Sequence, residues 1–389
     1  MATMKIKRKR VDQIRPKLSL HFDYWLLLAI AGLVIIGLLT VYSTTFDIGL
    51  MWKDDSTYYI KRQFMALFLG LAGFVVVMSF DYHFFRRFSV IIFVAALAGI
   101  VVTLMFGESS LGAQRGLLGG SFQPAEAAKL ATILYIAHWL SSKGERIKMV
   151  TYGLVPFSII VGLVCGLVVL EPDLSTAVLI ALVSFTLFFI AGADWRQFFL
   201  AIVIGGIVFA GLVAFFPHAT ARWELYTSSL NNPAEAGYQI GQTLAALGRG
   251  GVFGVGPGNS TQKFIPLPAA HTDGAFAIIA EEFGLIGSLS VMAIMGLLVW
   301  RGLVAATRAR DGYGALLAIG ITCWLGYQAL LNIAVITAVI PFTGIPLPFI
   351  SYGGSAFAVS IVGAGILLNI SRDAGLTKRP QPKINRSQQ

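Results

Sequence analysis

The chain has 389 residues, of which 56% are hydrophobic and only 12% are charged, and its mean hydropathy is +0.77. This composition excludes an ordinary water-soluble domain and indicates a polytopic membrane protein. The net charge of +10 is explained by basic segments that contact anionic lipid at the inner leaflet, so membrane lipid is an expected partner and nucleic acid is not.

Ten apolar stretches of roughly 18 to 25 residues each are long enough to cross a hydrocarbon core of about 30 Å as helices. We therefore expect an all-α, ten-helix membrane domain over residues 24–373. A basic cytoplasmic tail, 1–23, precedes it, and a disordered cytoplasmic tail, 374–389, follows it. The expected spans are 24–42, 63–79, 88–106, 124–141, 151–170, 174–193, 197–216, 275–300, 312–340 and 355–371.

Lysine and arginine set the orientation of these spans. Most of the 29 basic residues fall in the two tails and in every second connection, which places both termini in the cytoplasm. The first span follows a basic stretch but is too long for a signal peptide and lacks a small-x-small cleavage site, so we expect it to remain uncleaved. Cys165 and Cys323 fall within spans, where they predict packing rather than a disulfide or a metal-thiolate site.

Three ionisable residues surround the start of the fourth expected span. Arg115 lies in the connection before it, where it is either a surface cation or a clamp for a diphosphate. Glu126 and Lys129 follow the helix-starting Pro124 at i,i+3 spacing, so they share one helix face and can neutralise each other. A structural ion pair and a substrate role are equally good interpretations, because charges inside a membrane are costly and tend to mark substrate paths.

The junction between the fifth and sixth spans reads Glu171-Pro-Asp173. Asp173 precedes Leu174-Ser-Thr and is typical of a helix N-cap, an interpretation that we prefer to direct chemistry.

The connection over 217–273 is far longer than the usual 4–6 residues or so, which indicates a functional outer loop. It contains an amphipathic segment, Tyr238–Leu247, followed by the glycine-rich run 248–258. No strand precedes these glycines, so they do not form a dinucleotide fingerprint. Turns that fold the loop back onto the bundle are the simpler interpretation, and a nest of backbone N–H groups near a phosphate is the sharper one.

Asp273 ends this loop at the lip of the eighth expected span, where an ionisable side chain indicates function. His271 lies two residues earlier and is suited either to orient Asp273 or to cap the helix. Glu281 and Glu282 follow at a rise of about 12 Å, a depth at which carboxylates need partners or protons. We expect Lys129 and Arg115 to be those partners, which would draw the fourth and eighth spans together around an outward-facing cavity.

Three prolines between Pro341 and Ser355 exclude a regular helix before the last span. Non-helical backbone near membrane depth is tolerated only against protein or a watery cavity, so we expect a re-entrant or interfacial wall here.

Several of these segments together resemble the SEDS family, the shape, elongation, division and sporulation proteins such as FtsW, RodA and SpoVE. The motifs that carry the resemblance run from the first span to the last and include Gly112-Ala-Gln-Arg115, Phe122-Gln-Pro-Ala-Glu126-Ala-Ala-Lys129, Glu171-Pro-Asp173-Leu-Ser-Thr-Ala177, Gly237-Tyr-Gln, Gly256-Pro-Gly-Asn-Ser-Thr-Gln-Lys263, His271-Thr-Asp273, Glu281-Glu282 and Pro346-Leu-Pro-Phe-Ile-Ser-Tyr-Gly-Gly-Ser355. The stretch that ends at Lys263 is more similar to the FtsW and SpoVE branch than to the RodA branch.

The resemblance implies a ten-helix bundle in the bacterial cytoplasmic membrane and peptidoglycan glycosyltransfer on its outer face, polymerising lipid II. The family's essential acidic residue matches Asp273. The implied partners are a class B penicillin-binding transpeptidase and other elongation or division proteins. The chain departs from the family pattern at Gly116 and Gly274, where aromatic residues are usual, at Ala125 in place of serine, and at Glu171 in place of glutamine.

Chain extension requires an acceptor sugar hydroxyl to attack an anomeric carbon that carries a lipid diphosphate, for which one general base and a cationic clamp suffice. We expect Asp273 to be the base and the reaction to invert the anomeric centre. The substrate-binding candidates are Arg115, Glu126, Lys129, Arg222, Lys263, His271, Glu281 and Glu282, and the structural or lipid-binding candidates are Glu171, Asp173, Ser351, Gly353 and Gly354. No cofactor is required, and a Mg or Mn ion at the diphosphate is compatible with the sequence although no ligand cluster demands one.

Three other functions compete with polymerisation. A lipid flippase or transporter would also use an outward cavity with buried charges, but the inverted repeats typical of transporters are not visible in the sequence. A lipid-linked sugar ligase differs from a polymerase only in its product. A non-catalytic scaffold of the cell-wall complex would tolerate loss of the Asp273 carboxylate.

Overall fold

The computed structural model describes residues 22–110, 113–116, 122–231, 238–262 and 272–375, with only the backbone path for 108–110, 113–115, 217–219, 230–231 and 373–375. Its elements in chain order are α1 Tyr24–Lys53, α2 Tyr58–Ser79, α3 Tyr82–Phe106, β1 Glu108–Ser110, β2 Ala113–Gly116, α4 Pro124–Lys143, the 3-10 helix η1 Gly144–Lys148, α5 Leu154–Leu170, α6 Leu174–Ile190, α7 Trp195–Phe215, α8 Pro217–Asn231, α9 Tyr238–Gly250, α10 Ala275–Arg308, α11 Gly312–Ile336 and α12 Gly354–Gly375. Lys263, His271 and most of both tails lie outside the described residues, as does the side chain of Arg115.

Each of the ten expected spans corresponds to one helix of the described chain, and the protein is an α-helical, multi-pass membrane protein. Seven helices, α1, α2, α3, α7, α10, α11 and α12, are long and apolar enough to cross a membrane. The shorter apolar helices α5 and α6 have 17 residues each, and α4 has 20 but carries Glu126 and Lys129. The antiparallel pair β1–β2 between α3 and α4 corrects the expectation of a purely helical chain.

Aspartate side chains define where many of these helices begin. The carboxylates accept a hydrogen bond from a backbone N–H of the first turn, which satisfies a donor that the helix itself leaves unpaired. These N-caps are Asp23 of α1, Asp81 of α3, Asp173 of α6, Asp194 of α7 and Asp311 of α11. The prediction that Asp173 caps a helix is therefore confirmed.

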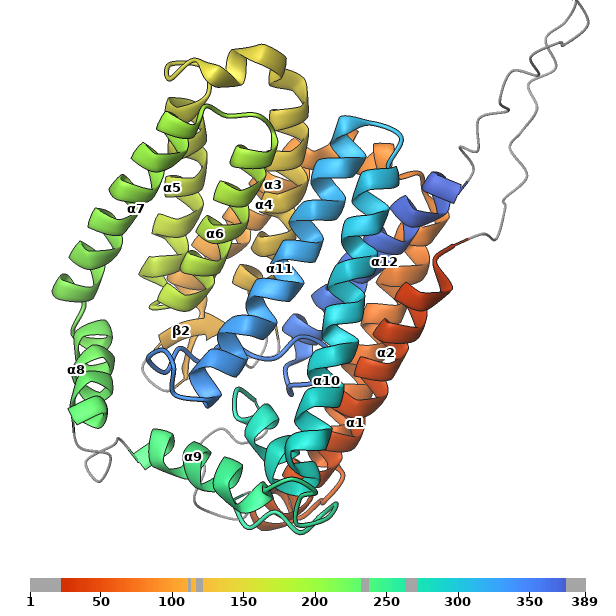
Figure 1. Cartoon of the computed structure of the whole chain (residues 1–389), viewed down its shortest axis with the longest axis vertical. Helices are drawn as coiled ribbons and strands as arrows, with labels where there is room; N and C mark the ends of the chain where they lie inside the picture. The colour runs from red at the N-terminus through yellow and green to blue at the C-terminus, as the bar shows by residue number, and fades with distance from the viewer. Residues whose placement is uncertain (1–21, 111–112, 117–121, 232–237, 263–271, 376–389) are drawn as a thin grey trace, which may run out of the picture.

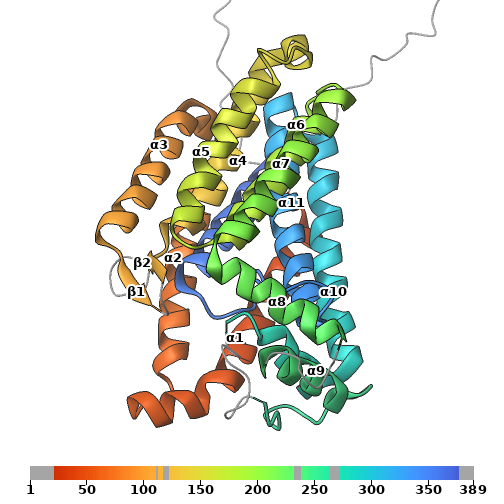
Figure 2. The same cartoon turned by 90° about the vertical axis from the view of Figure 1, so that its left-hand side faces the viewer.

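The core lies between α4, α10, α11 and α12. Helix α2 packs along α12, α10 packs against both α1 and α11, and α3 packs against α4 (Figures 1 and 2). Helix α7 lies at the margin, because among its side chains only Gln197 and Ala201 are buried. The hairpin β1–β2, α8 and α9 all lie in the lower half of Figures 1 and 2, and we call this end of the bundle the α9 end.

The expected outer loop over 217–273 is largely helical where it is described. The amphipathic segment Tyr238–Leu247 is confirmed as helix α9, which buries Ile240, Thr243 and Ala246 on one face. Helix α8 was not expected, and it follows α7 after the single residue Phe216. Where it is described, the polar connection thus contains two helices and the glycine-rich run, all at the α9 end.

Helix α10 is broken at Gly284, which has φ +64° and ψ −159°. The break frees backbone groups, and the glycine-rich run satisfies them: Val255 N–H and Gly256 N–H each donate to a carbonyl of Glu281 or Glu282 at 3.0 Å. A side chain at Gly254 would overlap the Glu282 carbonyl, so only glycine permits this approach. Turns that fold the run back are therefore confirmed, and the N–H groups of 254–256 donate to protein carbonyls rather than forming a phosphate nest.

Residues 337–353 between α11 and α12 contain no helix, as the prolines predicted, and we call them the wall segment. Its second half is buried against protein: Leu347, Phe349 and Ile350 are inaccessible, and the Phe349 carbonyl lies against Gly37 of α1. Ser351 accepts a hydrogen bond from Leu347 N–H at 2.8 Å. The wall segment thus has a buried half, residues 345–351, and a more exposed half, residues 337–344.

Candidate functional site

Asp273 lies one residue before the N-cap of α10 and is half-buried. The Thr272 hydroxyl donates to its Oδ1, and Asn332 of α11 donates to its backbone carbonyl at 2.9 Å. Its Oδ2 faces Gly344 of the wall segment, where a Cβ atom would lie only 3.3 Å away. The carboxylate is therefore held between α11 and the wall segment.

Two amides on α11, one turn apart, fix the wall segment. Asn332 donates to the Ile345 carbonyl at 2.8 Å, and Gln328 donates to the Pro346 carbonyl at 2.9 Å. Gln328 Oε1 in turn accepts from Lys129 Nζ at 3.1 Å. The amide pair therefore connects the surroundings of Asp273 to the charged residues of α4.

Glu126 and Lys129 form the expected i,i+3 ion pair, with 2.8 Å between Oε2 and Nζ. Their side chains are only 6% and 3% exposed, and the Lys129 ammonium lies 5.6 Å from the centre of the Trp324 ring. Removing one partner of such a buried pair typically costs about 3–5 kcal/mol, because the other charge is left uncompensated.

Glu281 and Glu282 do not pair with Lys129, so that part of the expectation is wrong, and the expected pairing with Arg115 falls on a side chain outside the described residues. Glu281 accepts from the Ser260 hydroxyl and from Thr261 N–H at 3.2 Å. Glu282 accepts from the Ser43 hydroxyl of α1 at 2.7 Å. The reason is the break at Gly284, which docks the first part of α10 onto the glycine-rich run instead of onto α4.

Glu281 binds residues 260–262, which precede Asp273 in the chain. It is fully buried, and besides Ser260 and Thr261 it accepts a bond from Gln262 N–H at 3.4 Å, with Arg249 Nη1 4.0 Å away. The first part of α10 therefore follows Asp273 directly and, through Glu281, also binds residues 260–262, which precede Asp273 in the chain.

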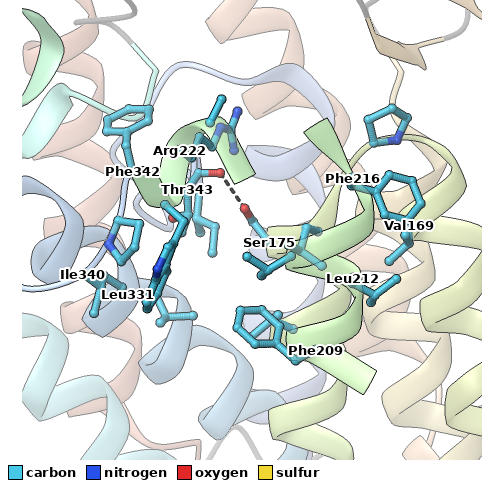
Figure 3. Close-up of a pocket in the computed structure, with 18 of the residues that line it drawn as sticks. Val169, Ser175, Phe209, Leu212, Phe216, Arg222, Leu331, Ile340, Phe342 and Thr343 are labelled. Carbon is cyan, nitrogen blue, oxygen red and sulfur yellow. Dashed lines mark hydrogen bonds between the residues drawn. The ribbon is translucent and has the colours of Figure 1, made fainter. Parts of the chain in front are cut away.

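A largely apolar cavity of about 540 Å³ lies on the other side of the wall segment (Figure 3). It is formed by the start of α6, the end of α7, α8 and residues 340–345, and Arg222 of α8 lines it. Ser175 donates to the Thr343 carbonyl at 2.5 Å and closes one side. Thr343 and Ile345 line the cavity while Gly344 between them faces Asp273, so one strip of backbone separates cavity and carboxylate.

The remaining predicted positions lie at or beside the ends of helices. Glu171 is fully buried at the end of α5, and Asp173 accepts from the Thr176 hydroxyl at 2.9 Å. Gly353 N–H donates to Gln63 at 3.4 Å, and α12 begins at Gly354. Within the described residues, no three His, Cys, Asp or Glu side chains gather as metal ligands.

Comparison with known proteins assigns the family. The profile of the Cell cycle protein family, FtsW/RodA/SpoVE, matches residues 24–375. The chain belongs to this family. It is 37% identical to stage V sporulation protein E of Bacillus subtilis, over 90% of this chain and 97% of that protein. It is 35% identical to a probable peptidoglycan glycosyltransferase FtsW of Trichlorobacter lovleyi, over 92% of this chain and 95% of that protein.

Two solved structures have the same fold as this FtsW/RodA/SpoVE chain. One comes from a study of how a peptidoglycan synthase complex coordinates polymerization and crosslinking, with a TM-score of 0.75, 25% identity, and coverage of 92% of this chain and 99% of that one. The other is the rod shape determining protein RodA of Thermus thermophilus, with a TM-score of 0.68, 25% identity, and coverage of 91% and 98%.

Sequence reasoning missed several residues that build the site of this family member. Gln328 and Asn332 were detectable in principle, since two amides four residues apart on an apolar helix must find partners. Gly344 was not detectable as a neighbour of Asp273, because nothing local indicates which distant side chain a glycine faces.

Proposed function

We propose that this protein is a peptidoglycan glycosyltransferase that polymerises lipid II at the outer face of the bacterial cytoplasmic membrane. Membership of the FtsW/RodA/SpoVE family and the activity named for its FtsW relatives support the reaction class. The observation that carries the site is the Asp273 carboxylate, fixed at a helix start against Gly344, with an apolar cavity directly behind that strip of backbone.

In the proposed reaction Asp273 accepts the proton of the acceptor sugar hydroxyl. The hydroxyl oxygen bonds to the anomeric carbon of the donor as the bond from that carbon to the polyprenyl diphosphate breaks, which inverts the anomeric centre. A diphosphate leaves without a strong acid, so one carboxylate base and nearby cations are sufficient.

The cavity is suited to the lipid side of the donor. Its apolar lining from α6, α7 and α8 fits part of a polyprenyl chain, and Arg222 supplies a cation that can bind diphosphate oxygens in bidentate fashion. We propose Arg115 and Lys263 as further diphosphate cations, and His271 as a residue that contacts sugar or orients Asp273. A Mg or Mn ion carried by the diphosphate is compatible with this arrangement.

Lys129 and Glu126 act in this proposal through the packing of α4 against α11. Lys129 is buried and its ammonium is engaged by Glu126 and by Gln328, so we assign it to fixing the wall segment rather than to direct contact with substrate. In this proposal Glu281 anchors the backbone at Thr261, before Asp273 in the chain, and Glu282 connects α10 to Ser43 of α1.

We further propose ten transmembrane helices with both termini in the cytoplasm and the α9 end outside. The distribution of the basic residues supports this orientation. Helices α5 and α6, at 17 residues, span about 25 Å, a mismatch that local thinning of the bilayer accommodates at modest cost.

A class B penicillin-binding transpeptidase is the proposed partner, together with other elongation or division proteins. The likeness to a chain of a peptidoglycan synthase complex that couples polymerization with crosslinking supports this assignment. The similarity to SpoVE and FtsW relatives supports an FtsW-like branch.

The break at Gly284 is the one observation that favours a lipid transporter, because transporters place substrate sites at discontinuous helices. The described groups freed at this break are bonded to the glycine-rich run, which leaves the polymerase as the preferred function.

The test is polymerisation of purified lipid II by the wild-type protein, by Asp273→Asn and by Asp194→Asn, each with and without the cognate transpeptidase. Asp194 is a matched carboxylate that caps α7 away from the site. We expect glycan ladders from wild type and Asp194→Asn and none from folded Asp273→Asn, a loss of at least about 10²-fold for a general base. Ladders from Asp273→Asn would move the base elsewhere, and lipid II translocation into vesicles without any ladder would establish the transporter.

A further inference from the structure

We propose that Asn332 is a positioning residue that sets the distance between the Asp273 base and the wall segment. The inference rests on the proposed glycosyltransferase function and deepens it, because it names a group that acts on the reaction without contacting substrate. No charge and no chemistry of its own is required of Asn332.

Both N–H protons of the Asn332 side-chain amide are donated to backbone carbonyls. Asn332 Nδ2 donates to the backbone carbonyl of Asp273 at 2.9 Å and to that of Ile345 at 2.8 Å. The side chain is only 1% exposed, so a leucine at this position leaves both carbonyls without the donor that they have in the wild type. The two carbonyls belong to segments that are distant in sequence, and a single NH₂ group holds them in register.

This register matters because the reacting carboxylate faces the residue next to Ile345. Gly344 lies opposite Asp273 Oδ2, close enough that a Cβ atom there would be 3.3 Å away. Asn332 therefore fixes the two backbone segments that meet at the Asp273 carboxylate, and so fixes the direction in which the base can face an acceptor hydroxyl. A misplacement of about 1 Å in such an arrangement costs roughly 10²-fold in rate.

Gln328 supports the same arrangement from one helical turn away. Its amide donates to the Pro346 carbonyl, the neighbour of the one that Asn332 holds, and its own carbonyl accepts from Lys129. The wall segment is thus fixed at two consecutive carbonyls, but only Asn332 also reaches the Asp273 backbone.

The chain contains a matched control for Asn332. Asn369 of α12 is also fully buried, and its Nδ2 likewise donates to two backbone carbonyls, those of Val77 and Phe80, both at 2.6 Å. These carbonyls lie at the end of α2 away from the α9 end. Loss of either asparagine therefore breaks the same pair of bonds, and only one of them adjoins the proposed site.

The experiment compares Asn332→Leu with Asn369→Leu in the full-length protein with its cognate transpeptidase. Thermal midpoints in detergent measure stability, and initial rates over a series of lipid II concentrations separate kcat from KM. We expect similar losses of stability in the two variants. We expect kcat of Asn332→Leu to fall about 10²-fold with KM within about twofold, and both constants of Asn369→Leu to stay within about twofold of wild type.

A milder pair keeps the comparison decisive if the leucine variants do not fold. Asn332→Ser and Asn369→Ser retain one donor and admit water, and we expect an intermediate loss of kcat, about tenfold, in Asn332→Ser alone. Equal kcat in the Asn332 and Asn369 variants, or a loss expressed in KM alone, overturns the positioning role. An inactive wild type overturns the proposed function itself and the positioning role with it, an outcome that the wild-type rate reveals before any variant is compared.

Discussion

Asp273 is held by side chains and backbone from three parts of the chain, and these differ in how well the sequence predicts them. The aspartate itself was predictable, because an ionisable residue at the lip of an apolar run is costly unless it has a function. Its contacts with Asn332 and Gly344 were not, since they join residues that lie far apart in the sequence and leave no local pattern. The same holds for Glu281, whose serine and threonine partners replaced the expected lysine.

Gly344 provides a test of the space around Asp273 at the scale of one residue. Its φ of +74° disfavours any side chain by about 1–2 kcal/mol, and a Cβ atom there would also press on Asp273 Oδ2. We expect Gly344→Ala to lose at least about tenfold in kcat for lipid II polymerisation, measured per folded molecule.

Gly192 is the matched control for that substitution. It has φ +95° in the turn between α6 and α7, and a Cβ atom there would meet nothing within 4 Å. Gly192→Ala should therefore lose a similar amount of stability and keep its activity. A Gly344→Ala protein as active as Gly192→Ala would show that the wall segment does not constrain the base.

At the scale of elements, hydropathy predicted the described helices better than the connections between them. The spans follow from apolar length, and α9 follows from its amphipathic pattern. The break of α10 was not predictable, because Gly284 is one of several glycines in this helix. Only its φ and its contact with the glycine-rich run distinguish it from the others. Helix α8 was missed because its sequence has no marked apolar face.

The docking of the glycine-rich run on α10 predicts the effect of a single methyl group. Gly254→Ala would drive a Cβ atom into the Glu282 carbonyl, at φ +81°, and separate the run from the break that it satisfies. We expect loss of thermal stability together with loss of polymerisation, because the same contact anchors the loop that ends at Asp273. Protease sensitivity of the segment before α10 should rise in parallel.

Gly248→Ala is the comparison for this element. It lies in α9 with nothing within 4 Å of its Cβ direction, and alanine favours the helix by up to about 1 kcal/mol. The variant should be as active as wild type and at least as stable. If Gly254→Ala behaved in the same way, the run would be a passive connection rather than an anchor.

At the scale of the whole molecule, the proposed site has two sides that the wall segment separates. Asp273, α11 and the first part of α10 lie on one side, and the apolar cavity under α7 and α8 lies on the other. Because the marginal helix α7 buries few residues, one side of the cavity is formed by a helix with little packing against the bundle. Chemistry and lipid binding should therefore respond to different substitutions.

A substitution that fills the cavity tests whether lipid binding and chemistry take place on different sides of the wall segment. Val178 of α6 lines the cavity, and Val178→Trp would occupy space that the proposal gives to the polyprenyl chain. Removing apolar contact with the lipid weakens ground-state and transition-state binding equally, so we expect KM for lipid II to rise about tenfold or more while kcat changes little. Ile207→Trp, on the exposed face of α7, adds the same ring outside the cavity and should leave both constants near wild type. A fall in kcat at constant KM for Val178→Trp would instead place the cavity on the same side of the reaction as Asp273, and unchanged kinetics would remove the cavity from the substrate path.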